Sequence, residues 1–175
     1  PSSTLRVANY VANINADLGL ATLDIDSGTA NLNVASSSAD IDLSGGTLNV
    51  AGSTAMSGDL TWSGGTVAGG GTLSLTGILD QSSSSTVYLR ETTLIHSNSS
   101  GSSRIANTSS SGFNIENGAL LRNTGSLTLS VEAPNGILYI DQDSGPLGGR
   151  FENTGTLIKT GAGRADIGNY GVMTF

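Results

Sequence analysis

Short triplets of the form apolar–any–apolar recur along this 175-residue chain, and a polar turn of Gly, Ser, Asn or Asp follows each one. Alternation with a period of two places both apolar side chains on one face of a β-strand. Three successive triplets begin at the evenly spaced positions Leu23, Leu32 and Ile41. Other triplets are Leu5-Arg6-Val7, Leu48-Asn49-Val50, Leu60-Thr61-Trp62, Leu73-Ser74-Leu75, Val87-Tyr88-Leu89, Phe113-Asn114-Ile115 and Leu127-Thr128-Leu129. The pattern predicts an all-β chain of very short strands, with Trp62 on the buried face beside Leu60.

The turns change style near position 100. Ser-Gly-Gly turns such as 44–46 and 63–65 dominate the N-terminal part, and Asn-Thr-Gly turns at 123–125 and 153–155 mark the C-terminal part. The two Asn-Thr-Gly turns precede near-matching strands at 126–129 and 156–159, which gives an internal repeat. We expect one domain over 1–175 with two sub-segments, 1–97 and 113–175, joined by a polar excursion at 98–112.

Two architectures fit strands and turns at this spacing. In a parallel β-solenoid, coils stack on one another and the apolar triplets line the interior. In an antiparallel β-sandwich, strands follow one another closely along the chain and are joined by hairpins. Very short strands and identical side-chain types in register favour a right-handed parallel β-helix of short, unequal coils, with the antiparallel β-sandwich as the alternative.

Composition excludes several classes of function. The net charge is −7 and the seven Lys and Arg residues are dispersed, so no basic patch is predicted to bind nucleic acid. No apolar run is long enough to span a membrane as a helix, so no membrane insertion is expected. The chain has no Cys, which removes disulfides and thiolate metal sites.

Two segments resemble repeats of large bacterial surface proteins. They are Gly58-Asp59-Leu60-Thr61-Trp62-Ser63-Gly64-Gly65-Thr66-Val67 and Phe151-Glu152-Asn153-Thr154-Gly155-Thr156-Leu157-Ile158-Lys159-Thr160-Gly161. They are similar to filamentous-haemagglutinin-like adhesins and autotransporter passengers, which are right-handed parallel β-helices. The resemblance implies an adhesive role outside the bacterial cell, at its surface, but no secretion role because the secretion-domain sequences are not visible.

The sequence gives little support for a catalytic site. Asp24 and Asp26, and also Asp40 and Asp42, form i, i+2 pairs that strand alternation places on a solvated outer face. His96 is the only histidine and is expected in an exposed loop beside Ser97, since no nucleophile-elbow motif accompanies it. We therefore expect a non-catalytic protein, with a carbohydrate-binding or carbohydrate-degrading β-helix as the alternative.

Two features are candidate ligand sites. The segment from Asp141 through Asp143 resembles the start of a calcium loop but lacks the later acidic ligands, so a turn without a cofactor is preferred. Tyr88 and Tyr139 each alternate with apolar neighbours and are expected to face outward as a platform for glycans.

The two ends of the chain read as strands without polar caps. An uncapped solenoid end exposes a sheet edge and core residues, which invites pairing. The candidate edge residues are Leu5 and Val7 at one end and Val172 and Phe175 at the other. The expected function is a rigid structural or adhesive rod whose partners are other copies of itself, flanking repeats of the same protein, or host and matrix glycans, and which stacks end to end into fibres.

Overall fold

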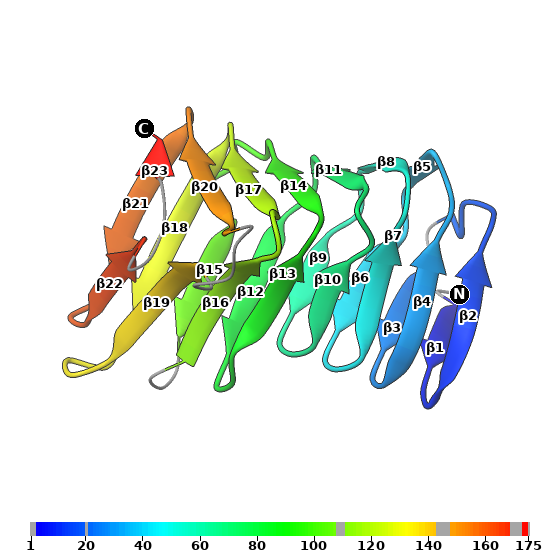
Figure 1. Cartoon of the computed structure of the whole chain (residues 1–175), viewed down its shortest axis with the longest axis horizontal. Helices are drawn as coiled ribbons and strands as arrows, with labels where there is room; N and C mark the ends of the chain where they lie inside the picture. The colour runs from blue at the N-terminus through cyan, green and yellow to red at the C-terminus, as the bar shows by residue number, and fades with distance from the viewer. Residues whose placement is uncertain (1–2, 20, 108–110, 143–147, 169–172, 175) are drawn as a thin grey trace.

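The triplets form strands that lie side by side along the long axis of the molecule (Figure 1). This computed structural model describes residues 3–19, 21–107, 111–142, 148–168 and 173–174, and the described part contains no helix. Three sheets run the length of the stack. Sheet A contains β1 (Thr4–Val7), β3 (Thr22–Ile25), β6 (Asp40–Leu43), β9 (Leu60–Trp62), β12 (Leu79–Ser83), β15 (Arg104–Asn107), β18 (Ser126–Val131) and β21 (Thr156–Thr160).

The other two sheets complete each coil. Sheet B contains β2 (Tyr10–Ile14), β4 (Gly28–Leu32), β7 (Thr47–Val50), β10 (Thr66–Ala68), β13 (Val87–Arg90), β16 (Ser111–Glu116), β19 (Ile137–Gln142) and β22 (Arg164–Ile167). Sheet C contains β5 (Ser36–Ser37), β8 (Ser53–Met56), β11 (Thr72–Leu75), β14 (Thr93–His96), β17 (Leu120–Asn123), β20 (Arg150–Asn153) and β23 (Met173–Thr174). From β3 onward the chain visits sheets A, B and C in turn, so neighbours in a sheet come from successive coils.

Every pairing between described strands is parallel, which confirms the β-helix and makes the antiparallel sandwich wrong. The coils are unequal, as predicted. Thr22 lies opposite Thr4 in the first coils, whereas Arg104 lies opposite Asp80 further along, where the chain needs more residues to return to the same sheet. Thr156 lies opposite Ser126, so the internal repeat seen in the sequence is one full coil. The spacing of the early triplets, by contrast, is half a coil, since Leu23 pairs with Ile41.

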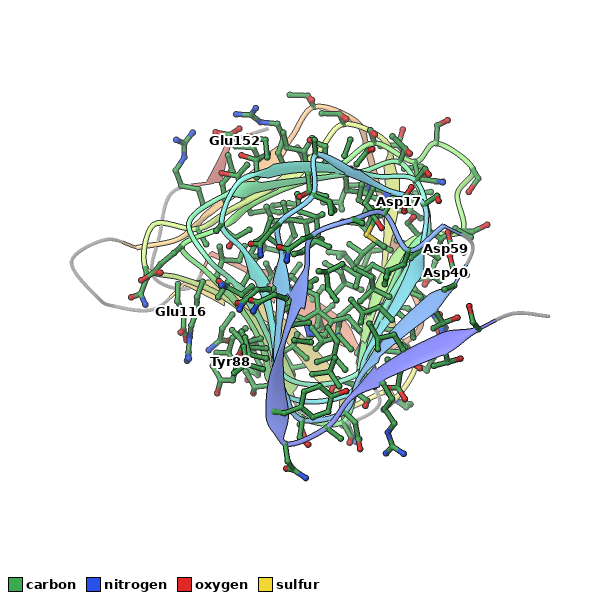
Figure 2. All side chains as sticks on the ribbon, turned by 90° about the vertical axis from the view of Figure 1, so that its right-hand side faces the viewer. Asp17, Asp40, Asp59, Tyr88, Glu116 and Glu152 are labelled. Atoms are coloured by element: carbon green, nitrogen blue, oxygen red, sulfur yellow. The ribbon has the colours of Figure 1, made fainter. Side chains whose placement is uncertain are left out.

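Inward-facing side chains form rows that run through the stack, and one such row in sheet A shows the principle. Its members, in register order, are Val7, Ile25, Leu43, Trp62, Gln81, Ile105, Leu129 and Lys159. Trp62 is completely buried, as predicted, and its ring meets the ring of Phe113 from sheet B edge to face at 5.1 Å. The end-on view in Figure 2 shows the three sheets closing around this filled interior. Full burial of each large apolar side chain contributes about 2 kcal/mol.

Outward-facing side chains also pair from coil to coil. On sheet B, Asn31 Nδ2 donates to Asn13 Oδ1 at 2.8 Å, and Asn49 Nδ2 donates to Asn31 Oδ1 at 2.7 Å. Stacked parallel strands place equivalent residues about 4.8 Å apart, so the amides of successive coils can form a ladder. We call these three residues the Asn ladder.

Glycine is required where the corners between sheets A and B stack. A Cβ on Gly64 would lie 2.3 Å from the carbonyl oxygen of Ser44 in the preceding coil, and a Cβ on Gly45 would lie 2.2 Å from that of Asp26. Contacts this short with backbone atoms force the coils apart. The Ser-Gly-Gly turns therefore set how closely these corners approach.

The polar segment 98–112 differs from the expected excursion. Its centre, β15, pairs with β12 on one side and with β18 on the other, and Ile105 is fully buried. Residues 108–110 lie outside the described part of the chain. The segment lengthens a coil at its corners while keeping a strand in sheet A, because Ile105 fills the inward position between Gln81 and Leu129.

Candidate functional site

Tyr88 carries the most distinctive outward cluster, on sheet B. It lies between the fully buried Val87 and Leu89 and faces outward, as strand alternation predicts. The guanidinium of Arg90 lies 4.4 Å from the centre of the Tyr88 ring, and Arg90 Nε donates to Glu116 Oε2 at 2.7 Å. Asn114 Nδ2 donates to the other Glu116 oxygen at 3.3 Å. We call Tyr88, Arg90, Asn114 and Glu116 the tyrosine cluster; Figure 2 labels two of its members.

Charge and hydrogen bonding hold this cluster rigid. The Glu116 side chain is only 10% exposed, and its carboxylate accepts from Arg90 of the neighbouring strand β13 and from Asn114 of its own strand, β16. Arg90 remains 42% exposed, so part of its guanidinium faces solvent beside the Tyr88 ring. A half-exposed phenol and a fixed cation can together recognise a ring that carries hydroxyl or acidic groups.

Tyr139 also lies on the outer side of sheet B, between the buried Leu138 and Ile140. Its register partners are Gly112 and Asp166, whereas Tyr88 pairs with Asn114. The two tyrosines are thus two strands and two positions apart, a separation of about 12 Å between Cα atoms from standard strand spacings. Both tyrosines face outward on sheet B, as the sequence predicts, but they lie too far apart to contact each other directly.

The calcium-loop candidate is only partly described. Asp141 lies at the end of β19, where its backbone pairs with Asn114. Asp143 lies outside the described residues. Among the described residues, no group of three or more His, Asp or Glu side chains is arranged to hold a metal ion.

The paired carboxylates lie on the outer face of sheet A, as predicted. The intervening Ile25 and Ile41 are buried, while Asp24 and Asp42 are neighbours in one outward row. Arg6 Nε approaches Asp24 at 3.6 Å. Partial burial, and secondarily the charge of Asp24, raise the pKa of the Asp42 carboxyl.

A second set of carboxylates has a structural task at the corner that leads into sheet A. Asp40 Oδ1 accepts the backbone N–H of Asp59 at 2.9 Å, and Asp59 Oδ1 accepts that of Ile78 at 2.7 Å. Asp17 accepts the N–H groups of Ser38 and Gly19, and these bonds lower the pKa of its carboxyl. Figure 2 shows Asp17, Asp40 and Asp59 on the same side of the stack. Each carboxylate ties its own coil to the next.

His96 is not in an exposed loop: that expectation is wrong. It is fully buried in the inward row of sheet C, where it follows Leu75 and precedes Asn123. Its Nδ1 lies 2.8 Å from Asn123 Oδ1, and its Nε2 lies 2.8 Å from Ser103 Oγ. The alternation Leu94-x-His96 was the available signal, and the polar residues that follow concealed it.

The arrangement of Ser103, His96 and Asn123 matches a nucleophile, a base and an orienting group in connectivity. All three side chains are fully buried, however, so a substrate has no route to the Ser103 hydroxyl in this conformation. The imidazole therefore acts here as a hydrogen-bonding link between coils. We call His96, Ser103, Asn123 and Asn153 the histidine network.

The candidate assembly edges differ at the two ends of the stack. Val7 is completely buried, and Leu5 faces inward but is 37% exposed because no coil covers it. Val172 and Phe175 lie outside the described residues. At that end the inward row of sheet A finishes with Lys159, whose Nζ donates to the carbonyl of Gly161 at 2.5 Å. A charge in an inward position discourages a further strand from pairing.

The tyrosine cluster and the paired carboxylates thus lie on the outer faces of sheets B and A. None of the described residues forms a helix with the length and hydrophobicity that crossing a membrane requires. No protein-family model, no curated protein and no solved structure matches this chain.

Proposed function

We propose that this chain is a non-catalytic structural and adhesive module of a bacterial cell-surface or other extracellular protein. The observation that carries the proposal is the single apolar core, which runs from Val7 in the first coil to Phe151 near the last. Each coil buries its inward side chains against both neighbours, so the module resists bending as a rod. Such a rod holds its outer faces at a fixed distance and orientation from an attachment point.

The adhesive part of the proposal concerns the outer face of sheet B. The tyrosine cluster is preorganised, because Glu116 fixes Arg90 and Arg90 stacks on Tyr88. Preorganised groups lose little conformational entropy on binding. The partner that fits a partly exposed phenol beside a cation is a host or matrix glycan, including one that carries carboxylates or sulfates.

A glycan array probed with the purified chain tests this proposal. We expect binding to at least one acidic glycan class, and Tyr88→Ser should weaken it about tenfold, equivalent to about 1.4 kcal/mol. Ile158→Ser is the matched control, since Ile158 is 42% exposed on the outer face of sheet A. Equal loss in both variants, or no glycan binding by a chain that remains folded, contradicts the adhesive role.

End-to-end assembly is part of the proposal at one edge. The β1–β2 edge offers unpaired backbone groups and the partly exposed inward side chain of Leu5, and a coil of the same architecture would cover them. Lys159 opposes growth beyond β21 because stacking would bury its ammonium. Lys159→Leu should therefore increase self-association on size-exclusion chromatography, whereas Lys159→Arg should not. If the Leu variant associates no more than the Arg variant, Lys159 does not limit growth.

A second candidate, a carbohydrate-degrading β-helix, is favoured by Asp24 and Asp42. These carboxylates are neighbours in register, and partial burial raises the pKa of Asp42, so its carboxyl group holds a proton more readily than an ordinary aspartate does. Glycoside hydrolysis uses two carboxyl groups about 5–9 Å apart. Release of reducing sugar from a polysaccharide by the chain, abolished by Asp42→Asn and kept by Asp59→Asn, would favour this candidate over the first.

A further inference from the structure

The histidine network occupies the middle of the stack, where the inward row of sheet C changes from apolar to polar side chains. The inward row of sheet C reads Ser37, Met56, Leu75, His96, Asn123 and Asn153 in register order. His96 is the first ionisable group in this row and the only histidine in the chain. It therefore belongs to the one side-chain type that ordinarily changes charge between pH 5 and 8.

The hydrogen bonds determine which form of the imidazole is present. Asn123 Nδ2 donates to Asn153 Oδ1 at 2.7 Å and to the carbonyl of Thr156 at 3.0 Å. These acceptors fix the amide so that Asn123 Oδ1 faces His96, and His96 Nδ1 must carry the proton that it donates. His96 Nε2 is then an acceptor for the Ser103 hydroxyl.

Ser103 completes the network from the other side. Its Oγ accepts the backbone N–H of Leu79 at 3.1 Å, so its own proton is available to His96 Nε2. Donors and acceptors thus match only when the imidazole is neutral. The network links three successive coils, through Leu79 and His96 in one, Ser103 and Asn123 in the next, and Asn153 in the third.

A second proton on His96 breaks the match of donors and acceptors in this interior. Nε2–H could donate to the second lone pair of Ser103 Oγ, but the Ser103 proton would then need a new acceptor. The charged side chains of the strands packed around it alternate outward: Arg122 of β17 pairs with Glu152, and Arg104 of β15 pairs with Asp80 of β12. β14 carries no other charged residue, and β11 carries none. No carboxylate of these described strands therefore neutralises an imidazolium.

We propose that the histidine network is an acid-sensitive joint, at which the middle coils loosen as the pH falls while the apolar N-terminal coils stay packed. Burial lowers the pKa of His96, and the hydrogen bond with Asn123 opposes this only partly. The unfolded chain then binds a proton that the folded chain does not. The stability that the neutral His96 contributes is fully present above the pKa of about 6.5 that histidine has in the unfolded chain. It is lost progressively as the pH falls below that value, until the pH reaches the lower pKa of His96 in the folded chain.

Hydrogen exchange at pH 7.5 and pH 5.0 tests this on the intact chain. After correction for intrinsic exchange, the opening equilibrium of β14 and β17 should rise by up to about tenfold for each pH unit below 6.5, and β4 and β7 should change little. Unchanged protection of β14 and β17, or equal loss in β4 and β7, overturns the proposal.

His96→Asn is the decisive variant, since an amide at this position extends the Asn123–Asn153 pairing without a group that titrates in this range. It should abolish the difference in protection between the two pH values. A variant that opens in acid as readily as the wild type would assign the effect to the carboxylates instead and overturn the proposal. If His96→Asn fails to fold, nuclear magnetic resonance titration of the single wild-type imidazole decides: an apparent pKa at or above about 6.5, the ordinary value, overturns the proposal.

Discussion

The N-terminal coils, through β11, and the coils from β12 onward use one architecture with different interiors. In the N-terminal part the coils are short, the inward rows are nearly all apolar, and the Asn ladder lies outside. From β12 onward the coils are longer, Gln81 and the histidine network lie inside, and ion pairs such as Arg90–Glu116 lie outside. Amide and imidazole groups thus occupy the core of the second region, whereas amides of the first region line its outer face.

This difference shows that the pairing register between strands of successive coils, and not the number of residues in a coil, defines the fold. Extra residues enter at the corners, while the strands keep their neighbours in all three sheets. The cost of a polar interior is small only when each group has a partner, because an unpaired buried donor or acceptor costs about 1–3 kcal/mol. In the interior, specific hydrogen-bond networks accordingly link the C-terminal coils, whereas apolar contacts link the N-terminal coils.

The largest expected effect compares two leucines in the same inward row. Leu43→Ala leaves a cavity between Ile25 and Trp62, and should reduce the free energy of unfolding by about 4 kcal/mol. Leu129 is also buried, but its neighbour in the row is the exposed Lys159, so water can enter the space that Leu129→Ala leaves and the loss should be about half as large. Urea denaturation measures both, and equal losses would show that the two regions are packed alike.

The next comparison concerns the stacked glycine corner. Gly64→Ala places a methyl group 2.3 Å from the Ser44 carbonyl, and the forced separation should cost about 3 kcal/mol. Gly52→Ala is the matched control, because nothing lies within 4 Å of its Cβ position. The melting temperature of Gly64→Ala should be clearly lower than that of Gly52→Ala. A Gly64→Ala variant as stable as the wild type would mean that the corners can move apart without loss of stability.

Asparagines on the two sides of the sheets provide a third comparison. Asn123→Ala removes partners from His96 and Asn153 inside the core, and should cost about 2 kcal/mol. Asn31→Ala removes two ladder bonds on the outer face, where water replaces them, and should cost about 1 kcal/mol. Denaturation midpoints at constant m-value separate the two, and the reverse order would contradict the distinction between inner and outer amides.

The smallest effect is expected for an exposed ion pair. Arg104 and Asp80 are 48% and 39% exposed, so Arg104→Met should change stability by no more than about 0.5 kcal/mol, and less at high salt. Arg122→Met removes one of the two arginine partners of the nearly buried Glu152, the other being Arg150, and should cost more. Equal losses of stability for Arg104→Met and Arg122→Met in low salt would indicate that burial of the carboxylate does not strengthen the ion pair.

The strands whose inward residues are apolar, including those that carry Trp62 and Tyr88, were predictable from the sequence. The place of β15 in the stack and of His96 in the core were not. A strand in a parallel stack is held by the coils on both sides, so its inward position accepts Ser, Asn or His when the neighbouring coil supplies a partner. For His96 that partner is Asn123, which belongs to the next coil and lies beyond the reach of local periodicity.

The unequal corners have a consequence for how such a molecule can change. Each strand contacts mainly the preceding and following coils, and the corners already accommodate both the short coil from Thr4 to Thr22 and the long coil from Ser126 to Thr156. A duplicated or deleted coil would leave the remaining rows aligned, and foreign loops inserted at a corner would project sideways without disturbing them. The molecule is in this respect a spacer of adjustable length, along which display sites can be positioned in steps of about 4.8 Å.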